Sequence, residues 1–470
     1  MPKRLNESER ADDPRRGLAS VSALLSDPSI EAMIGQHGRA VVTDAARTVL
    51  AGYRRTLGRD DPPPATSALV RDVSAAVLAQ DRNGLRRVIN ATGVILHTGL
   101  GRAVLPQRAV DALASLNGCC NLQIDLDTGL RGKRDFSCEQ LLTRLTGAEA
   151  AMVVNNNAAA TYLILTALCK GREVVVSRGQ LIEIGGSFRL PDCVHQSGAT
   201  LVEVGTTNKT HLRDYELALS VNTGAILRVN PSNYRIIGFT EDVPIRDLVG
   251  LKRRQAVLVI DDLGCGALLD LRAFGLPREP TVQESVAAGA DLVCFSGDKL
   301  IGGPQSGIIV GSRALIQQIK KHPLTRMLRV GKMTVLALER TLQLFLDPEG
   351  LVKNHPTLRM LALPAASLRQ RASRMAKRLA GKSAKLQVRV AAAVSSTGGG
   401  SLPGFDLPTS VVALRSTELS ADRLCRLLRL NEPPIIARIK DDEVLLDMRT
   451  LLEGDESAVV EALGGLANGG

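Results

Sequence analysis

Lys299 is the residue around which the chemistry of this sequence can be arranged. It lies in the stretch FSGDKLIGGPQSG, residues 295–307, whose first residues end the apolar run ADLVCFS, a pattern that predicts a buried strand. The polar turn Ser296-Gly297-Asp298 then presents this one lysine, and partial burial would favour its neutral amine. A lysine needs a neutral amine to form a Schiff base. An ordinary solvated lysine at a strand-to-loop corner is the alternative.

Two acids precede the lysine in the segment VLVIDDLGCG, residues 257–266. The apolar run predicts a buried strand ending in Asp261 and Asp262, and open α/β sheets bind ligands at the carboxyl ends of their strands. An acid followed by a lysine at the end of a later strand is typical of pyridoxal phosphate (PLP) enzymes, in which the acid keeps the pyridine nitrogen protonated and the lysine holds the aldehyde. A helix cap or a metal-binding pair is the alternative, but no His or Cys cluster nearby supports a metal.

A third segment, VVNNNAAATYLILTAL (residues 153–168), predicts a phosphate site. A strand that ends in Asn residues and feeds a helix leaves the backbone N–H groups of the first helical turn available to an anion. We expect Asn156, Asn157 and Ala158 to form this site. Asn caps are common, so the order of phosphate site, acid and lysine carries the inference.

Longer motifs resemble one protein family closely. They are NATGVILHTGLGRA, VNNNAAA, SRGQLIEIGGSFRLPD, EVGTTNKTHLRDYE, SNYRIIGFT, DDLGCG, FSGDKLIGGPQSGIIVG and HPLTRMLRVGKMT. The chain resembles the bacterial L-seryl-tRNA(Sec) selenium transferases, also called selenocysteine synthases, densely from Arg87 to Leu346 and weakly toward both ends. The resemblance implies an α/β enzyme, a PLP-dependent transferase of the aspartate-aminotransferase fold type. The implied reaction converts seryl-tRNA(Sec) to selenocysteyl-tRNA(Sec) with selenophosphate, through a PLP-bound dehydroalanyl intermediate.

Site residues follow from the motifs and the resemblance together. The predicted cofactor-binding residues are Lys299, Asp262, Asn156, Asn157, Ala158 and Ser296. The predicted catalytic residues are Lys299, Arg102, Arg326 and Arg329, and no metal is expected. Asp262 is preferred to Asp261 because the family string reads Asp-Leu-Gly, and the two roles exchange if this assignment slips by one residue.

Three arginines are predicted to hold the selenium donor. Arg326 and Arg329 lie three residues apart, so they share one face if their stretch is helical, and two guanidiniums suit a tetrahedral oxyanion. The resemblance places both in the active site and implies that Arg102 closes the third side. A basic surface turn that touches tRNA phosphates is the alternative.

The sequence departs from the family pattern at several positions. Gly99 stands where relatives usually have Asn, Gln180 where Glu is more frequent, and Gly331 where Asp is common. Asn230 stands where His is usual. These departures affect contacts near the cofactor ring and the arginines, and leave the lysine, the acid and the phosphate turn unchanged.

Length and composition limit the classes of protein to which this chain can belong. The chain has 470 residues, of which 44% are hydrophobic, so it is long enough for two or three globular domains. A net charge of +11 favours phosphate-rich partners, whereas an aromatic content of 2% argues against extensive base stacking. The eight cysteines show no repeated spacing, the N-terminus has no apolar signal region, and no long apolar run occurs. A cytoplasmic enzyme that binds no membrane is therefore expected.

Three domains are predicted. Residues 1–85 form a small helical N-terminal domain, to which the family assigns tRNA binding; a dimerisation arm is the alternative. Residues 86–346 form the PLP-binding large α/β domain, with a mostly parallel sheet because most of its apolar runs are continuous rather than alternating. The seven runs expected to be strands are AEAAMVVNN, REVVVSRG, ATLVEVG, GAILRVN, AVLVIDD, ADLVCFS and SGIIVG. Residues 347–470 form a small α+β C-terminal domain.

Two other functions compete with the favoured one. The first is a PLP-dependent lyase or aldolase paralogue that acts on a small amino acid without tRNA, for which the helical N-terminal region would have no use. The second is a catalytically silent tRNA-binding protein, against which Asp262 and Lys299 argue. Serine-charged tRNA(Sec) and selenophosphate are the expected partners, and the family implies a homo-oligomer, a ring of dimers.

Overall fold

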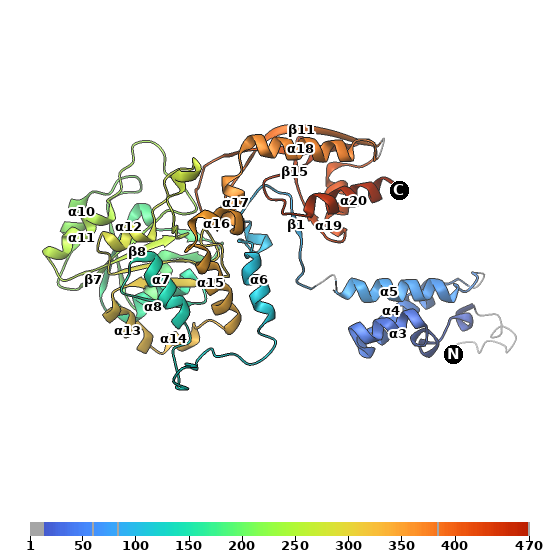
Figure 1. Ribbon diagram of the computed structural model, residues 1–470, viewed down its shortest axis with the longest axis horizontal. Coiled ribbons are helices and arrows are strands. Elements are labelled where there is room, and N and C mark those ends of the chain that lie inside the picture. The colour runs from blue at the N-terminus through green and yellow to red at the C-terminus, as the bar shows by residue number, and fades with distance from the viewer. Residues whose placement is uncertain (1–13, 59–60, 82–83, 383–384, 469–470) are drawn as a thin grey trace, which may run out of the picture. The chain divides into compact units, whose positions relative to one another are not determined.

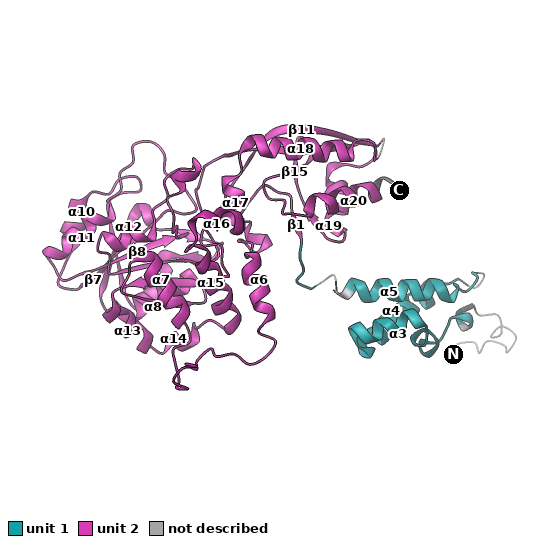
Figure 2. Cartoon of the chain, in the orientation of Figure 1, with its two compact units in different colours: residues 1–87 teal, residues 88–470 magenta. Residues whose placement is uncertain are grey.

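The computed structural model describes residues 14–58, 61–81, 84–382 and 385–468 (Figure 1). The chain forms two compact units, residues 1–87 and residues 88–470 (Figure 2). Within the described ranges, no helix is both long enough and apolar enough to span a membrane.

The first unit is a small helical bundle. Its elements are η1 (Pro14–Gly17), α2 (Val21–Leu25), α3 (Pro28–His37), α4 (Arg39–Thr56) and α5 (Thr66–Asp81). Apolar residues at three- and four-residue steps give α4 a buried stripe that includes Val42 and Leu50, and it packs against Leu69 and Val73 of α5 in one core. The predicted helices are thus present, while the boundary at residue 85 stays a prediction.

A seven-stranded sheet forms the centre of the second unit, in the order β2-β10-β9-β8-β7-β3-β6. All neighbouring strands are parallel except at β10, which is antiparallel to both β2 and β9. The seven apolar runs expected to be strands form this sheet, which confirms the mostly parallel sheet. Their bounds are β2 (Ala150–Val154), β3 (Glu173–Ser177), β6 (Thr200–Val204), β7 (Thr223–Val229), β8 (Leu258–Gly264), β9 (Leu292–Ser296) and β10 (Gly307–Gly311).

Helices cover both faces of this sheet, which is why its strands are continuous apolar runs. One face packs against α7 (Phe136–Thr146), α12 (Val282–Ala287) and α15 (Lys332–Leu344). The opposite face packs against α8 (Asn157–Leu168), α9 (Leu190–Gln196) and α13 (Arg313–Lys321). The remaining elements are η2 (Thr98–Leu100), α6 (Gln107–Ala114), η3 (Arg178–Gln180), β4 (Glu183–Ile184), β5 (Phe188–Arg189), α10 (Leu212–Ala218), α11 (Ile245–Gly250), η4 (Leu251–Arg253), η5 (Leu271–Phe274), α14 (Leu324–Met327), α16 (Pro348–Asn354) and α17 (Pro356–Ala362).

The C-terminal part of the second unit contains a four-stranded antiparallel sheet, in the order β11-β12-β15-β14. Its strands are β11 (Leu386–Ser395), β12 (Leu407–Ser416), β14 (Arg438–Lys440) and β15 (Glu443–Asp447). One face of this sheet shares a core with α18 (Ala365–Leu379), α19 (Ala421–Leu430) and α20 (Asp455–Asn468). This α+β composition agrees with the predicted pattern, and the domain bounds 86–346 and 347–470 stay predictions.

The NATG segment, residues 90–93, packs against the C-terminal sheet, although the two are far apart in sequence. Strand β1 (Ile89–Asn90) pairs in parallel with β13 (Ile435–Ile436). Gly93 has φ +79°, and a Cβ on it would lie 2.1 Å from a carboxylate oxygen of Asp447. Only glycine fits this close approach in the left-handed region. The motif is therefore required, at least in part, for packing.

Asp447 stabilises the packing of the NATG segment against the C-terminal sheet. We predict that Asp447→Ala lowers the free energy of unfolding by about 3 kcal/mol. The buried carboxylate accepts hydrogen bonds from Ser395 (3.0 Å), Thr409 (2.8 Å) and Arg438 (3.1 Å), which lose their acceptor in the variant. Urea unfolding followed by circular dichroism measures the change. Asp441→Asn, at an exposed position, is the matched control and should stay within about 0.5 kcal/mol of the parent. Equal losses in both variants would contradict the role given to Asp447.

Candidate active site

Lys299 lies in a tight buried turn after β9. Its side chain is only 6% exposed, and Gly303 N–H donates to the Gly297 carbonyl (2.8 Å) to close the turn. The buried ring of His355 packs against this turn, and its Nε2 lies 2.9 Å from the Ile301 carbonyl oxygen. Burial lowers the pKa of Lys299, while nearby Cys265 and Asp262 act in the opposite direction. The turn thus favours the neutral amine that the sequence predicts.

Asp261 and Asp262 point to opposite faces of the sheet, as neighbouring residues of a strand must. Asp261 pairs with Arg228 of β7 (2.9 Å) and accepts from Ser285 of α12 (2.6 Å). Asp262 faces α8 instead, and its charge reaches Lys299. Of the two acids, Asp262 is therefore the one on the side of the lysine.

The carboxylate of Asp262 is buried among neutral donors. It accepts hydrogen bonds from the Asn157 amide (2.8 Å), the Thr161 hydroxyl (2.9 Å) and the Gly264 N–H (2.9 Å). Burial raises the pKa of Asp262, and these hydrogen bonds together with the charge of Lys299 oppose that rise. A buried carboxylate in such surroundings is suited to a cationic partner.

The N-terminus of α8 lies beside this carboxylate. The side chain of Asn156 caps the helix by accepting from Ala159 N–H at 2.8 Å. The N–H groups of Asn157 and Ala158, in the first turn, have no acceptor within the helix. Strands β2, β8 and β9 run in the same direction, so Asn156, Asp262 and Ser296 all lie at the carboxyl edge of the sheet. Ser296 is buried at the end of β9, opposite Gly307 of β10.

Arg102 joins this region through an ion pair. Its guanidinium lies 2.7 Å from the carboxylate of Asp298, the residue before Lys299. Arg102 has φ +62°, which is uncommon for a residue with a side chain. The charge of Arg102 lowers the pKa of Lys299, and Asp298 opposes it.

The prediction that Arg326 and Arg329 share one face of a helix is wrong. Helix α14 ends at Met327, so only Arg326 is helical, and the two do not share a helix face. The backbone of Arg329 instead forms a bridge with Val154 at the end of β2. Leu328 accepts from Asn155 N–H at 3.0 Å, which places Arg329 close to the phosphate turn. Both arginine side chains are exposed, and neither forms an ion pair within the described part of the chain.

Two of the four departures from the family pattern, Gln180 and Asn230, form side-chain hydrogen bonds here. Gln180 is buried, accepts from Val229 N–H (3.0 Å) and donates to Asp242 (2.8 Å). Asn230 donates to Glu279 at 3.2 Å. Gly331 is the N-cap of α15, where it provides no side-chain hydrogen bond. Gly99 lies in η2.

Sequence reasoning missed a group of residues that contact the surroundings of Lys299. Glu279 is buried and accepts a hydrogen bond from the Cys265 thiol (2.8 Å), and burial raises the pKa of Glu279. A Cβ on Gly400 would lie 3.4 Å from both Lys299 Nζ and Ser232 Oγ. Ser232 lies in the SNYRIIGFT motif and Cys265 in DDLGCG, so the motifs were the available signal. Nothing in the sequence placed Gly400 next to the lysine.

The residues present fit a PLP cofactor. Asn157 Oδ1 and Ser232 Oγ are buried without a hydrogen-bond partner in the described structure. Asn157 lies beside Asp262, and Ser232 lies close to Lys299. An amine, a carboxylate and a helix N-terminus are the three groups that hold the aldehyde, the ring nitrogen and the phosphate of PLP. Among the described residues, no cluster of His, Cys, Asp or Glu is suited to a metal ion.

Fold and site together define a PLP-dependent enzyme of the aspartate-aminotransferase fold type, as the sequence predicts. A solved structure of D-glucosaminate-6-phosphate ammonia-lyase is similar, with a TM-score of 0.56 and 21% sequence identity over 83% of this chain and 99% of that chain. At that identity, the likeness concerns the fold alone.

The chain belongs to the L-seryl-tRNA selenium transferase family, whose model matches residues 88–452. The model for the N-terminal region of selenocysteine synthase matches residues 15–54. The L-seryl-tRNA(Sec) selenium transferase of Nitratidesulfovibrio vulgaris is 48% identical and covers 95% of this chain and 98% of its own length. The enzyme of the same name from Alkaliphilus metalliredigens is 47% identical, with 95% and 97% covered. The family is PLP-dependent, so the predicted cofactor is confirmed.

Lys299 provides the direct test of the cofactor site. We predict that Lys299→Ala removes the visible absorbance of lysine-bound PLP and the activity, while the circular dichroism spectrum is unchanged. Borohydride reduction of the parent protein, followed by peptide mass spectrometry, should leave a pyridoxyl group on the peptide that contains Lys299. Lys321→Ala, an exposed lysine in α13, is the control and should keep the absorbance. A pyridoxyl group on any other lysine would show the assignment to be wrong.

Proposed function

We propose that this protein converts seryl-tRNA(Sec) to selenocysteyl-tRNA(Sec) with selenophosphate as the selenium donor. The observation that carries this proposal is full-length similarity to enzymes of that name, including the helical N-terminal region. The lyase or aldolase alternative is not favoured. A tRNA substrate also supports the cytoplasmic location predicted from the sequence, which stays a prediction. The decisive experiment is selenocysteyl-tRNA formation from the purified protein, PLP, seryl-tRNA(Sec) and selenophosphate.

Some of the active-site residues would hold the cofactor, and Lys299 would transfer a proton. Asp262 would hold the pyridine nitrogen of PLP, while the first turn of α8, at Asn157 and Ala158, would bind its phosphate. When bound, PLP supplies an electron sink for the pair left on the serine Cα when its proton leaves. Lys299 Nζ is suited to accept that proton, because burial lowers its pKa and so favours the neutral amine. The serine hydroxyl then takes up a proton and leaves from Cβ as water. Selenium from selenophosphate bonds to Cβ in its place, the selenium–phosphorus bond is hydrolysed with release of phosphate, and Lys299 returns the proton to Cα.

The donor site is proposed at Arg102, Arg326 and Arg329. The exposed guanidiniums of Arg326 and Arg329 have donors available for a tetrahedral anion, and the backbone of Arg329 lies beside β2 at the edge of the sheet that carries the cofactor site. Arg102 approaches the same edge through Asp298.

We predict that Arg329→Ala raises the selenophosphate concentration needed for half-maximal rate about tenfold or more, while the affinity for seryl-tRNA is unchanged, because one charge-assisted contact to the anion is lost. Steady-state rates at varied selenophosphate, together with a filter-binding assay for tRNA, measure the two effects. Lys321→Ala, an exposed cation on α13, is the control. If tRNA affinity falls while the donor requirement is unchanged, the arginine belongs to the tRNA surface instead.

The N-terminal unit is the proposed tRNA-binding domain. Helix α4 buries Val42 and Leu50 and exposes Arg47, Arg54 and Arg55. Arg54 and Arg55 form no ion pair with a described residue, which leaves their charges available for phosphates. The unit is compact, and the cofactor motifs all lie in the other unit.

We predict that deleting residues 1–85 weakens tRNA(Sec) binding at least tenfold and leaves PLP bound. Arg54→Glu together with Arg55→Glu should weaken binding in the same direction and reduce its salt dependence, because fewer counterions are released. Electrophoretic mobility shifts over a salt series measure both effects. Arg423→Glu, exposed on α19, is the matched control. Unchanged affinity after the deletion would favour the dimerisation-arm alternative.

A homo-oligomer is also proposed, supported by exposed apolar side chains in the second unit. Leu126 is 76% exposed, Leu130 70% and Phe136 52%. Leu126 and Phe136 line a cavity of about 650 Å³ that extends to Leu336 of α15. Apolar side chains gathered in this way are typical of a surface covered by a partner, and a second copy of the chain is the partner that the family implies.

A further inference from the structure

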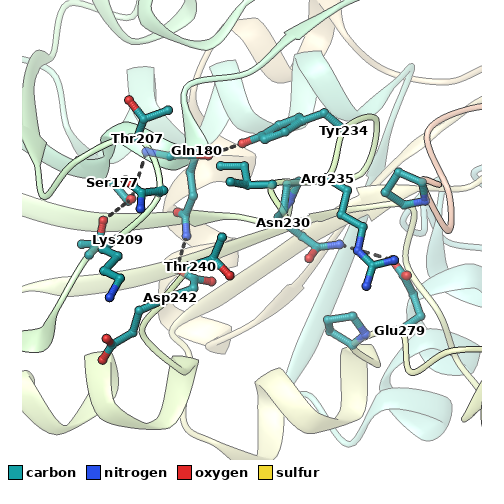
Figure 3. A pocket seen from close by; sticks show the side chains of 18 of the residues that line it. Ser177, Gln180, Thr207, Lys209, Asn230, Tyr234, Arg235, Thr240, Asp242 and Glu279 are labelled. Atoms are coloured by element: carbon teal, nitrogen blue, oxygen red, sulfur yellow. Dashed lines mark hydrogen bonds between the residues drawn. The ribbon is translucent and has the colours of Figure 1, made fainter. Parts of the chain in front are cut away.

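A second cavity, of about 460 Å³, lies in the second unit. Gln180 and Asn230, two of the departures expected near the cofactor ring, line it, whereas Lys299 and Asp262 do not. Figure 3 shows it between the hydrogen-bonded pair Gln180 and Asp242 and the pair Asn230 and Glu279, with Tyr234 at its edge. This volume is in the range of pockets that hold whole small molecules. It is larger than a tetrahedral anion such as selenophosphate needs.

Two segments that line the cavity lead away from residues beside Lys299. Ser232 and Gly400 meet beside the lysine, because a Cβ on Gly400 would lie 3.4 Å from both Ser232 Oγ and Lys299 Nζ. From Ser232 the chain continues to Tyr234 and Arg235, and from Gly400 it continues to Leu402, Pro403 and Phe405, all of which line the cavity. The cavity is therefore adjacent to the reactive amine.

A third wall is connected to the lysine through Glu279. This buried carboxyl group lines the cavity and accepts a hydrogen bond from the Cys265 thiol, and Glu279 also interacts electrostatically with Lys299. The cavity and Lys299 thus both lie near the buried polar residues Glu279 and Cys265.

The acids of the cavity have partners, whereas two of its cations do not. Glu241 lies 3.1 Å from His211, Asp242 accepts from Gln180, and Glu279 accepts from Cys265 and Asn230. Lys209 and Arg235 form no ion pair within the described residues. Tyr234, Phe405 and Pro403 add apolar surface. A ligand with a flat apolar part and a negative charge fits this lining.

We propose that the cavity binds the 3′-terminal adenosine of the aminoacyl-tRNA, a proposal that rests on the proposed function. In seryl-tRNA only the carbonyl carbon and the ester oxygen separate the serine Cα from the ribose of this nucleoside. When Cα is within reach of Lys299, the nucleoside must therefore lie next to the lysine, where the cavity is. The adenine would pack on Tyr234 and Phe405, and its 5′-phosphate would meet Arg235 and Lys209.

Binding of the trinucleotide CCA and the dinucleotide CC to the full-length holoenzyme tests this proposal. We expect CCA to bind about tenfold or more tighter than CC, because the terminal adenine contributes stacking that CC lacks. Isothermal titration calorimetry provides both affinities. Equal affinities would overturn the proposal, even if the enzyme still forms selenocysteyl-tRNA, so its failure is distinct from failure of the proposed function.

Variants locate the binding site. Arg235→Glu, at an exposed position, should lower the affinity for CCA about tenfold while PLP absorbance is retained. Tyr234→Leu should lower CCA affinity and leave CC affinity unchanged. Arg253→Glu, an exposed arginine outside the cavity, is the matched control and should bind CCA as the parent does. CCA affinity unaffected by Arg235→Glu and Tyr234→Leu would place the terminal nucleoside elsewhere and overturn the proposal.

Discussion

The burial of Lys299 and Asp262 together is the constraint on which the rest of the site depends. Removing an amine and a carboxylate from water costs free energy unless each finds compensation. The amine is compensated by a lowered pKa, which permits the neutral form, and the carboxylate by hydrogen bonds from Asn157, Thr161 and the Gly264 N–H. Because those donors are neutral, they hold the carboxylate in place without cancelling its charge.

The sheet brings these groups together at one edge. Parallel strands β2, β8 and β9 deliver the phosphate turn, the acid and the lysine in the same direction, and β10 returns between β2 and β9 in the opposite direction. This return strand fits closely, since a Cβ on Gly307 would lie 2.1 Å from the Asn156 carbonyl. The close fit of β10 thus fixes the spacing between the phosphate turn and the lysine turn.

The C-terminal sheet completes the site rather than standing apart from it. The connection between β11 and β12 runs through Gly398, Gly399 and Gly400, all with positive φ, and these residues pack against Leu96 and Lys299. Side chains larger than glycine would meet Leu96 or the lysine amine. The same connection continues to Leu402, Pro403 and Phe405, so one loop lies against Lys299 and also lines the cavity proposed for the terminal nucleoside.

The sequence by itself determined the seven strands and the order of predicted phosphate turn, acid and lysine, because continuous apolar runs and short motifs encode local structure and its ends. Tertiary structure alone decided which acid faces α8, since strand alternation sends the two aspartates to opposite faces but does not determine which face α8 covers. It also ended α14 before Arg329 and brought Gly400 and Glu279 to the lysine. Those contacts join segments far apart in the chain, and no local pattern of residues records which distant segment will pack against it.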